Sequence, residues 1–76
     1  MHFTNKLVDE LIWFQLYMNK PKTQEEANEN VIKHIKSLPK DEAKFIIYEG
    51  VRALEENGEP NAMSLAKRIR EEFIRN

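Results

Sequence analysis

The segment 7–18 constrains the fold most, because nearly every residue in it is apolar. Its polar residues are Asp9, Glu10 and Gln15. A helix on the surface of a small domain normally shows one apolar stripe and one solvated face, whereas a helix predicted at about 4–19 is apolar almost all round. The surplus apolar surface indicates a central helix, a self-association face or a partner-binding face.

Capping and helix-breaking residues define a second predicted helix at about 23–37. Thr23 and Glu26 have the spacing of a capping box, in which the hydroxyl accepts from a free backbone N–H and the carboxylate reaches back to the cap. Pro39 ends this helix, since proline cannot continue a helix and biases the residue before it towards an extended conformation.

Two further helices follow, at about 40–57 and 61–75. Gly58 can adopt the left-handed conformation that closes a helix, and Pro60 should prevent the third helix from resuming. Asn61 is then the expected cap of the fourth helix. No segment alternates with period two, so we expect no sheet. The predicted fold class is all-α, a compact small domain of four helices spanning residues 1–76.

Helical periodicity separates the predicted core from the surface. We expect the first helix to lie near the centre and Gly50 to allow a close helix approach. The expected core residues are Leu7, Leu11, Phe14, Ile47, Leu54, Ile69 and Phe73.

Composition excludes several classes of protein. Hydrophobic residues make up 41% and charged residues 33%, which is too apolar for a disordered tail and too charged for a membrane protein. The net charge of -1 gives no global field that would attract nucleic acid or anionic lipid. The chain has no cysteine, which suits a reducing compartment, and no apolar run of the ~20 residues that a span needs. We therefore expect a cytoplasmic protein without a membrane partner.

Two aromatic pairs fall on otherwise polar helix faces. Trp13 and Tyr17 lie among charged residues of the first helix, and Phe45 and Tyr48 lie near Arg52 on the third. Such residues can be half-buried parts of a small core. Aromatic residues beside an arginine also dominate binding hot spots, so these five residues are the candidate protein interface.

The alternative interpretation is DNA binding by the fourth helix. Its candidate contacts are Lys67, Arg68, Arg70 and Arg75, in a segment that superficially resembles a helix of a helix-turn-helix domain. Glutamates four residues from Lys67 and Arg68 would cancel part of that charge. The turn before this helix is also longer than the usual three or four residues.

Enzymatic chemistry lacks partners in the sequence. His34 is a lone histidine at the edge of an apolar stripe, and Ser37 and Ser64 have no neighbouring base and are expected to cap helices. No metal-binding or phosphate-loop motif occurs, so we expect no cofactor, metal or small-molecule substrate. The favoured function is a non-enzymatic regulator, inhibitor or adaptor that binds a protein partner or itself as a homodimer.

Overall fold

Four α-helices, the last extended by a short π-helix, build the computed structural model, which describes residues 6–74. The helices are α1 (Lys6–Tyr17), α2 (Gln24–Lys36), α3 (Lys40–Asn57) and α4 (Pro60–Ile69), and η1 (Arg70–Ile74) continues α4. No strand occurs in this described part of the chain. The predicted all-α class and the number of helices are confirmed.

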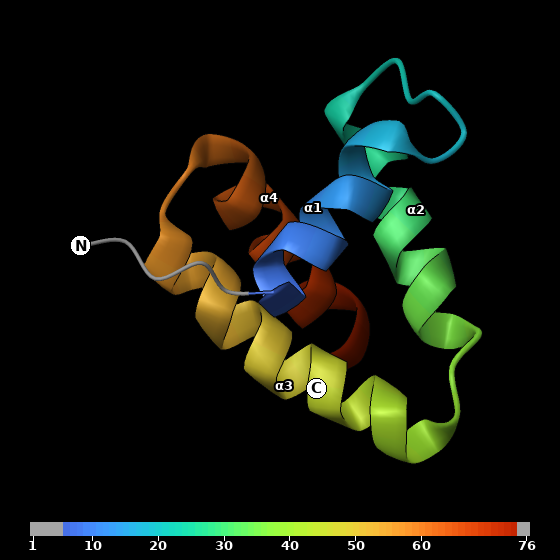
Figure 1. Cartoon of the computed structure of the whole chain (residues 1–76), viewed down its shortest axis with the longest axis vertical. Coiled ribbons are helices and arrows are strands. Elements are labelled where there is room, and N and C mark those ends of the chain that lie inside the picture. Colours follow the sequence, from blue (N-terminus) through green and yellow to red (C-terminus); the bar gives the residue numbers. More distant parts are fainter. Residues whose placement is uncertain (1–5, 75–76) are drawn as a thin grey trace.

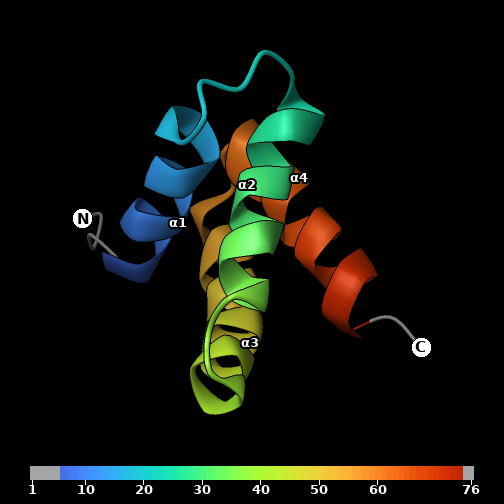
Figure 2. The ribbon, with the colours of Figure 1, turned by 90° about the vertical axis from the view of Figure 1, so that its right-hand side faces the viewer.

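The helices pack around one apolar centre, with α1 on one side of it. In Figure 1, α1 lies in front of α3 and α4, and α2 runs down beside it. The quarter turn in Figure 2 places α1 at one edge of the fold, with α2 towards the viewer and α4 on the opposite side from α1. The expectation that the first helix is central is therefore wrong. Its inner side packs on the other helices, while its outer side leaves Trp13, Leu16 and Tyr17 exposed.

The start of α2 follows the capping prediction in part. Thr23 is the N-cap, and its hydroxyl accepts a hydrogen bond from the backbone N–H of Glu26 at 3.1 Å. The Glu26 carboxylate accepts from the N–H of Lys22 at 3.5 Å, one residue before the cap. Two backbone donors that the helix cannot use are thereby satisfied.

The junction of α3 and α4 corrects one prediction. Gly58 has a φ of 76°, and its N–H closes α3 by donating to the Leu54 carbonyl at 3.2 Å. α3 does not resume at Pro60, which is the first residue of α4, so only Gly58 and Glu59 lie between the two helices. Proline suits that position, where its missing N–H would have no partner. Asn61 is consequently inside the helix and is not its cap.

The carboxyl-terminal ends of α1 and α4 also differ from the predicted ones. α1 stops at Tyr17, two residues early, because Asn19 and Lys20 have left-handed φ values of 55° and 45°. The α-helical part of the fourth helix ends at Ile69, where the wider π-helical turn begins. The predicted extensions to residues 4–5 and to residue 75 lie outside the described residues.

The core is centred on α2, α3 and α4 as well as on α1. Three expected core residues, Leu11, Leu54 and Ile69, are fully buried. The other four, Leu7, Phe14, Ile47 and Phe73, are half-buried at the margin of the core. Val31, Ile35, Val51 and Leu65, which helical spacing places on the apolar stripes of their helices, are buried as well, and so are Val8 and Ile32, which the spacing did not indicate.

Gly50 provides the predicted close approach between helices. A Cβ atom added at Gly50 would lie 3.0 Å from Cδ1 of Leu11, closer than ordinary van der Waals contact. α1 therefore rests directly on the backbone of α3 at this point.

A buried amide network joins α1 to α2 and α4. Gln15 is fully buried, and its Nε2 donates to Asn28 Oδ1 at 2.8 Å and to the Asn61 carbonyl at 3.0 Å. Asn61 Nδ2 donates in return to Gln15 Oε1 at 3.2 Å. Asn28 Nδ2 donates to the hydroxyl of Ser64 at 3.1 Å, so this serine bonds another helix and does not cap its own. Within residues 6–74, every buried polar side-chain atom has a hydrogen-bond partner.

Candidate protein interface

Three large apolar side chains lie together on the outer side of α1. Trp13 is 51% exposed, Leu16 44% and Tyr17 65%. Leu16 and Tyr17 follow Trp13 by three and four residues, a spacing that places all three on one helix face. We call Trp13, Leu16 and Tyr17 the α1 apolar patch. It faces outward because Val8, Leu11 and Gln15 occupy the opposite, buried side of the helix.

Leu16 was not among the candidate residues, although the sequence contains the signal for it. The candidates on α1 were its two aromatic residues, and Leu16 lies between them in the sequence and is exposed with them. Its inclusion makes the patch continuous across about one helical turn.

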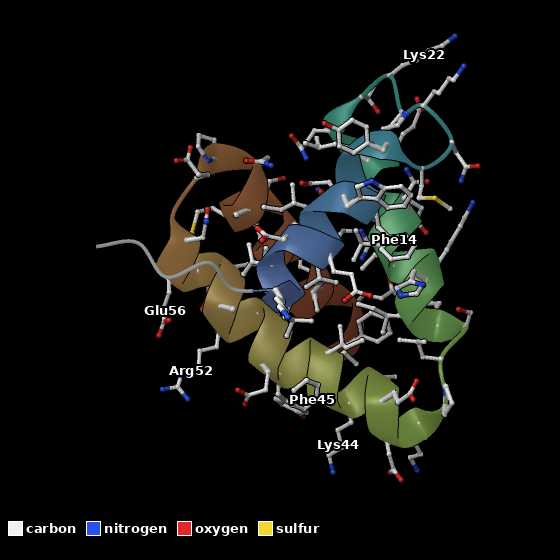
Figure 3. All side chains as sticks on the ribbon, in the orientation of Figure 1. Phe14, Lys22, Lys44, Phe45, Arg52 and Glu56 are labelled. Carbon is white, nitrogen blue, oxygen red and sulfur yellow. The ribbon has the colours of Figure 1, made fainter. Side chains whose placement is uncertain are left out.

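A row of rings connects the patch to α2. The rings of Tyr17 and Trp13 lie 6.1 Å apart, and Trp13 meets Phe14 edge-on at 5.5 Å. Phe14 in turn stacks on His34 at 3.9 Å, so this histidine serves packing between helices. Figure 3 shows Phe14 on the side of α1 that faces α2. These contacts restrain the Trp13 ring before any partner binds, which reduces the entropy that binding would cost.

Charged residues surround the α1 apolar patch at both ends. Asp9 and Glu10 precede Trp13 by four and three residues, and Lys20 lies three residues after Tyr17, the last residue of the helix. All three are exposed. None of them forms an ion pair with another residue of the 6–74 segment. Lys6 is also exposed, one turn before Glu10, so the amino-terminal end of the patch has two acidic residues and one basic residue, and the other end has a basic residue.

The candidate residues on α3 form a separate surface. Phe45 is 60% and Tyr48 55% exposed, and the Arg52 side chain lies 3.9 Å from Glu56. Figure 3 shows Phe45, Arg52 and Glu56 along one side of α3. Among the described residues, no ring contact joins Phe45 or Tyr48 to each other or to the rings of α1.

Phe45 and Tyr48 border two different shallow hollows. Phe45 and Arg52 border a hollow of about 300 Å³ that also touches Leu7 at the start of α1. Tyr48 borders another, of about 360 Å³, beside Lys40 and Phe73. The α3 pair thus offers two isolated rings, whereas the α1 pair lies within one continuous patch.

Two of the basic residues of the fourth helix form ion pairs with glutamates of the same chain. Arg68 donates to Glu72 at 2.8 Å and to Glu29 at 3.1 Å, which joins α4 and η1 to α2. Arg70 makes two hydrogen bonds to Glu55 of α3, at 2.8 and 2.9 Å. DNA binding needs unpaired basic groups, so these ion pairs weigh against the alternative interpretation.

The remaining candidate contacts of that alternative give little support. Lys67 is exposed, and the expected pair with Glu71 does not form among the ion pairs of residues 6–74. Arg75 lies outside the described residues. A single free lysine provides one phosphate contact, which is far fewer than a DNA-binding domain uses.

These ion pairs predict how the fold responds to acid. Hydrogen bonds from Lys36 and Arg68 lower the pKa of Glu72 below its ordinary value of 4.5, and Arg70 does the same for the pKa of Glu55. A lowered pKa in the folded state stabilises the protein above the ordinary value, and this contribution is lost as the pH falls through the lowered one.

We therefore expect the melting temperature to fall as the pH drops below about 4.5, and to fall less in a Glu72→Gln, Glu55→Gln double variant. Thermal melts followed by circular dichroism between pH 7 and pH 3 measure this. Glu49→Gln is the control, because Glu49 is exposed and in none of the ion pairs of residues 6–74. Identical acid profiles for the double variant and the control would contradict the assignment.

Neither a search of the described residues for a metal site nor a comparison of the chain with known proteins assigns a function. In residues 6–74 no group of three or more histidine, aspartate or glutamate side chains could hold a metal ion. No helix in that range is long and apolar enough to cross a membrane. Family models, curated proteins and solved structures gave no match to this chain. The function is therefore inferred from the chain's own residues.

Proposed function

We propose that this chain is a small non-enzymatic protein-interaction module that binds a protein, either another protein or a second copy of itself, through the α1 apolar patch. The observation that carries the proposal is the exposure of Trp13, Leu16 and Tyr17 on one face of a single helix. The proposal keeps the cytoplasmic location expected from the sequence.

The physical basis is the gain from removing this surface from water. Burial of apolar surface contributes roughly 25 cal/mol per Å². Tryptophan and tyrosine add ring contacts and a polar group at the edge, and they are enriched at the centres of protein interfaces. The row of rings leading to His34 restrains Trp13, so that little side-chain entropy remains to be lost.

The α3 surface takes second place in this proposal. Phe45 and Tyr48 are as exposed as the α1 rings, but they border different hollows, and no ring contact joins them in the described part of the chain. A binding hot spot consists of residues clustered in one desolvated region. The α1 apolar patch meets that condition better.

Trp13→Ala tests the proposal. We expect it to weaken binding at least about tenfold, since a central aromatic side chain contributes more than about 1.4 kcal/mol. The melting temperature should change by no more than about 4 °C, because half of the ring is already in water. The measurements are light scattering over a wide concentration range, quantitative capture of proteins from the source cells, and a thermal melt.

Met63→Ala is the matched control. Met63 is an exposed apolar residue on α4, 44% accessible like Leu16, and it lies outside the α1 apolar patch. It should leave self-association and the set of captured proteins unchanged. If Trp13→Ala lowers stability and binding together, or changes neither self-association nor capture, the α1 apolar patch is not an interface.

A further inference from the structure

The charges along α1 are arranged so that the helix is complementary to itself in the reverse direction. Asp9 and Glu10 lie before the α1 apolar patch together with one lysine, Lys6, which leaves this end with an excess of negative charge, whereas the exposed charges just beyond the patch, Lys20 and Lys22, are both basic. An antiparallel copy of the same helix would bring its basic end to the acidic end of the first. From this arrangement we infer that the partner of the patch is a second copy of this chain, bound with the two α1 helices antiparallel. The inference rests on the proposed function, since it uses the same patch.

The residue spacing fits a two-fold axis that crosses the outer side of α1 at the level of residue 15, midway between Trp13 and Tyr17. Trp13 lies two residues before that point and Tyr17 two residues after it, so Trp13 of each copy faces Tyr17 of the other. Glu10 lies on α1 before the patch, and Lys20 lies three residues beyond the last residue of the helix, so the two charges lie past opposite ends of the patch. A two-fold interface uses each contact twice, which gives two ring pairs flanked by two ion pairs. The antiparallel direction also places the positive end of each helix dipole beside the negative end of the other.

The structure leaves both parts of this interface accessible. Figure 2 shows α1 at the edge of the fold, where its outer side is not covered by another helix. Figure 3 shows Lys22, two residues beyond Lys20, past the carboxyl end of α1 and away from α3. Asp9, Glu10 and Lys20 have no ion-pair partner among residues 6–74, unlike Arg68 and Arg70, which pair with glutamates of the same chain. An approaching copy therefore breaks no internal ion pair.

The size of the patch sets the expected strength. Tryptophan and tyrosine side chains bury about 150–250 Å² each when fully covered, and here about half of that area is exposed. With Leu16 the patch offers a few hundred Å² per copy, which is less than the roughly 800 Å² per partner of a standard interface. We therefore expect a reversible dimer, populated at high protein concentration.

Charge reversal provides the decisive experiment. One variant carries Asp9→Lys and Glu10→Lys, and the other carries Lys20→Glu. Each alone places like charges opposite each other at both ends of the antiparallel pair. An equimolar mixture restores opposite charges at both ends. Sedimentation velocity over a concentration series, at physiological salt, measures the dimer dissociation constant of the wild type, each variant and the mixture.

We expect each variant alone to dimerise at least about tenfold more weakly than the wild type, and the mixture to regain wild-type association. Lys67→Glu is the control for net charge, since Lys67 is exposed on α4. It should dimerise like the wild type. Circular dichroism confirms that the variants fold, which their exposed positions favour.

Different outcomes separate this inference from the proposed function. A wild type that stays monomeric at every concentration, or a mixture that does not recover, overturns the antiparallel dimer. If Trp13→Ala still abolishes capture of another protein in that case, the proposed function stands and the partner is a different chain. If the wild-type dimer forms and survives Trp13→Ala, while capture of other proteins is also unchanged, both proposals fail.

Discussion

Leu11→Ala should lower the free energy of unfolding by about 2–5 kcal/mol, much of the roughly 4–11 kcal/mol expected for a chain of this length. Leu11 is 1% exposed and packs against α3 at Gly50, so its truncation leaves a cavity that the backbone of α3 cannot fill. Urea denaturation followed by circular dichroism measures the change. Leu16→Ala is the matched control on the outer side of the same helix, and it should cost less than about 0.5 kcal/mol.

The contact with Gly50 gives this prediction a second, sharper part. In the wild type, Gly50→Ala gains helix propensity but places a methyl group 3.0 Å from Leu11 Cδ1. In the Leu11→Ala background the obstructing atom is gone and the methyl group fills part of the cavity. The double variant should therefore be more stable than the sum of the single effects, by about 0.5–3 kcal/mol. Additive effects would mean that the two residues do not share this space.

Gln15→Glu should destabilise the fold by about 3 kcal/mol or more at pH 7, although the two side chains have nearly the same shape. An ionised carboxylate cannot donate the two hydrogen bonds that Gln15 gives to Asn28 and Asn61, and its charge would be buried without a cation in contact. Burial raises the folded-state pKa of the introduced carboxyl group above its ordinary value.

The pH dependence of this variant distinguishes a buried charge from lost packing. Below a pH of about 4.3 the introduced carboxyl group is neutral in both states and carries no charge penalty. As the pH rises from there to the raised pKa, the unfolded state loses its proton first, so the variant becomes less stable relative to the wild type. Denaturation of both proteins at pH 4 and pH 7 measures the difference. A penalty independent of pH would show that the site admits water.

Gln24→Glu is the corresponding control. Gln24 also donates to Asn28, at 3.1 Å, but it is exposed at the start of α2, where a carboxylate is favourable. The same substitution should therefore change stability little and show no extra loss between pH 4 and pH 7.

Local rules predicted the helices well where one residue dominates the outcome. Gly58 ends α3 and Thr23 caps α2 as expected, because a left-handed glycine and a capping hydroxyl act within a few residues. Asn61 was wrongly expected to cap the fourth helix, because Pro60 not only lies beyond the end of α3 but also is the first residue of α4. No capping side chain marks the start of α4 in the sequence, because its N-cap, Glu59, makes no side-chain hydrogen bond to the helix.

The candidate interface was predicted in part for a related reason. Helical spacing places Trp13 and Tyr17 opposite Leu11, and this local geometry holds in the structure. The burial of Gln15 could not be predicted in the same way, because its partners Asn28 and Asn61 are 13 and 46 residues away. Only the packing of three helices brings those amides together, and by taking Gln15 inward it leaves the outer side of α1 more apolar than its composition indicates.

The buried amide network also determines the order in which the fold loosens in acid. Its members are amides and a hydroxyl, none of which titrates. The hydrogen bonds that hold α1 against α2 and α4 therefore do not depend on the protonation of a side chain. Within residues 6–74 no ion pair involves α1, whereas Glu72 and Glu55 tie η1 to α2 and α3. We therefore expect acidification to weaken the contacts of the carboxyl-terminal turn before those of α1.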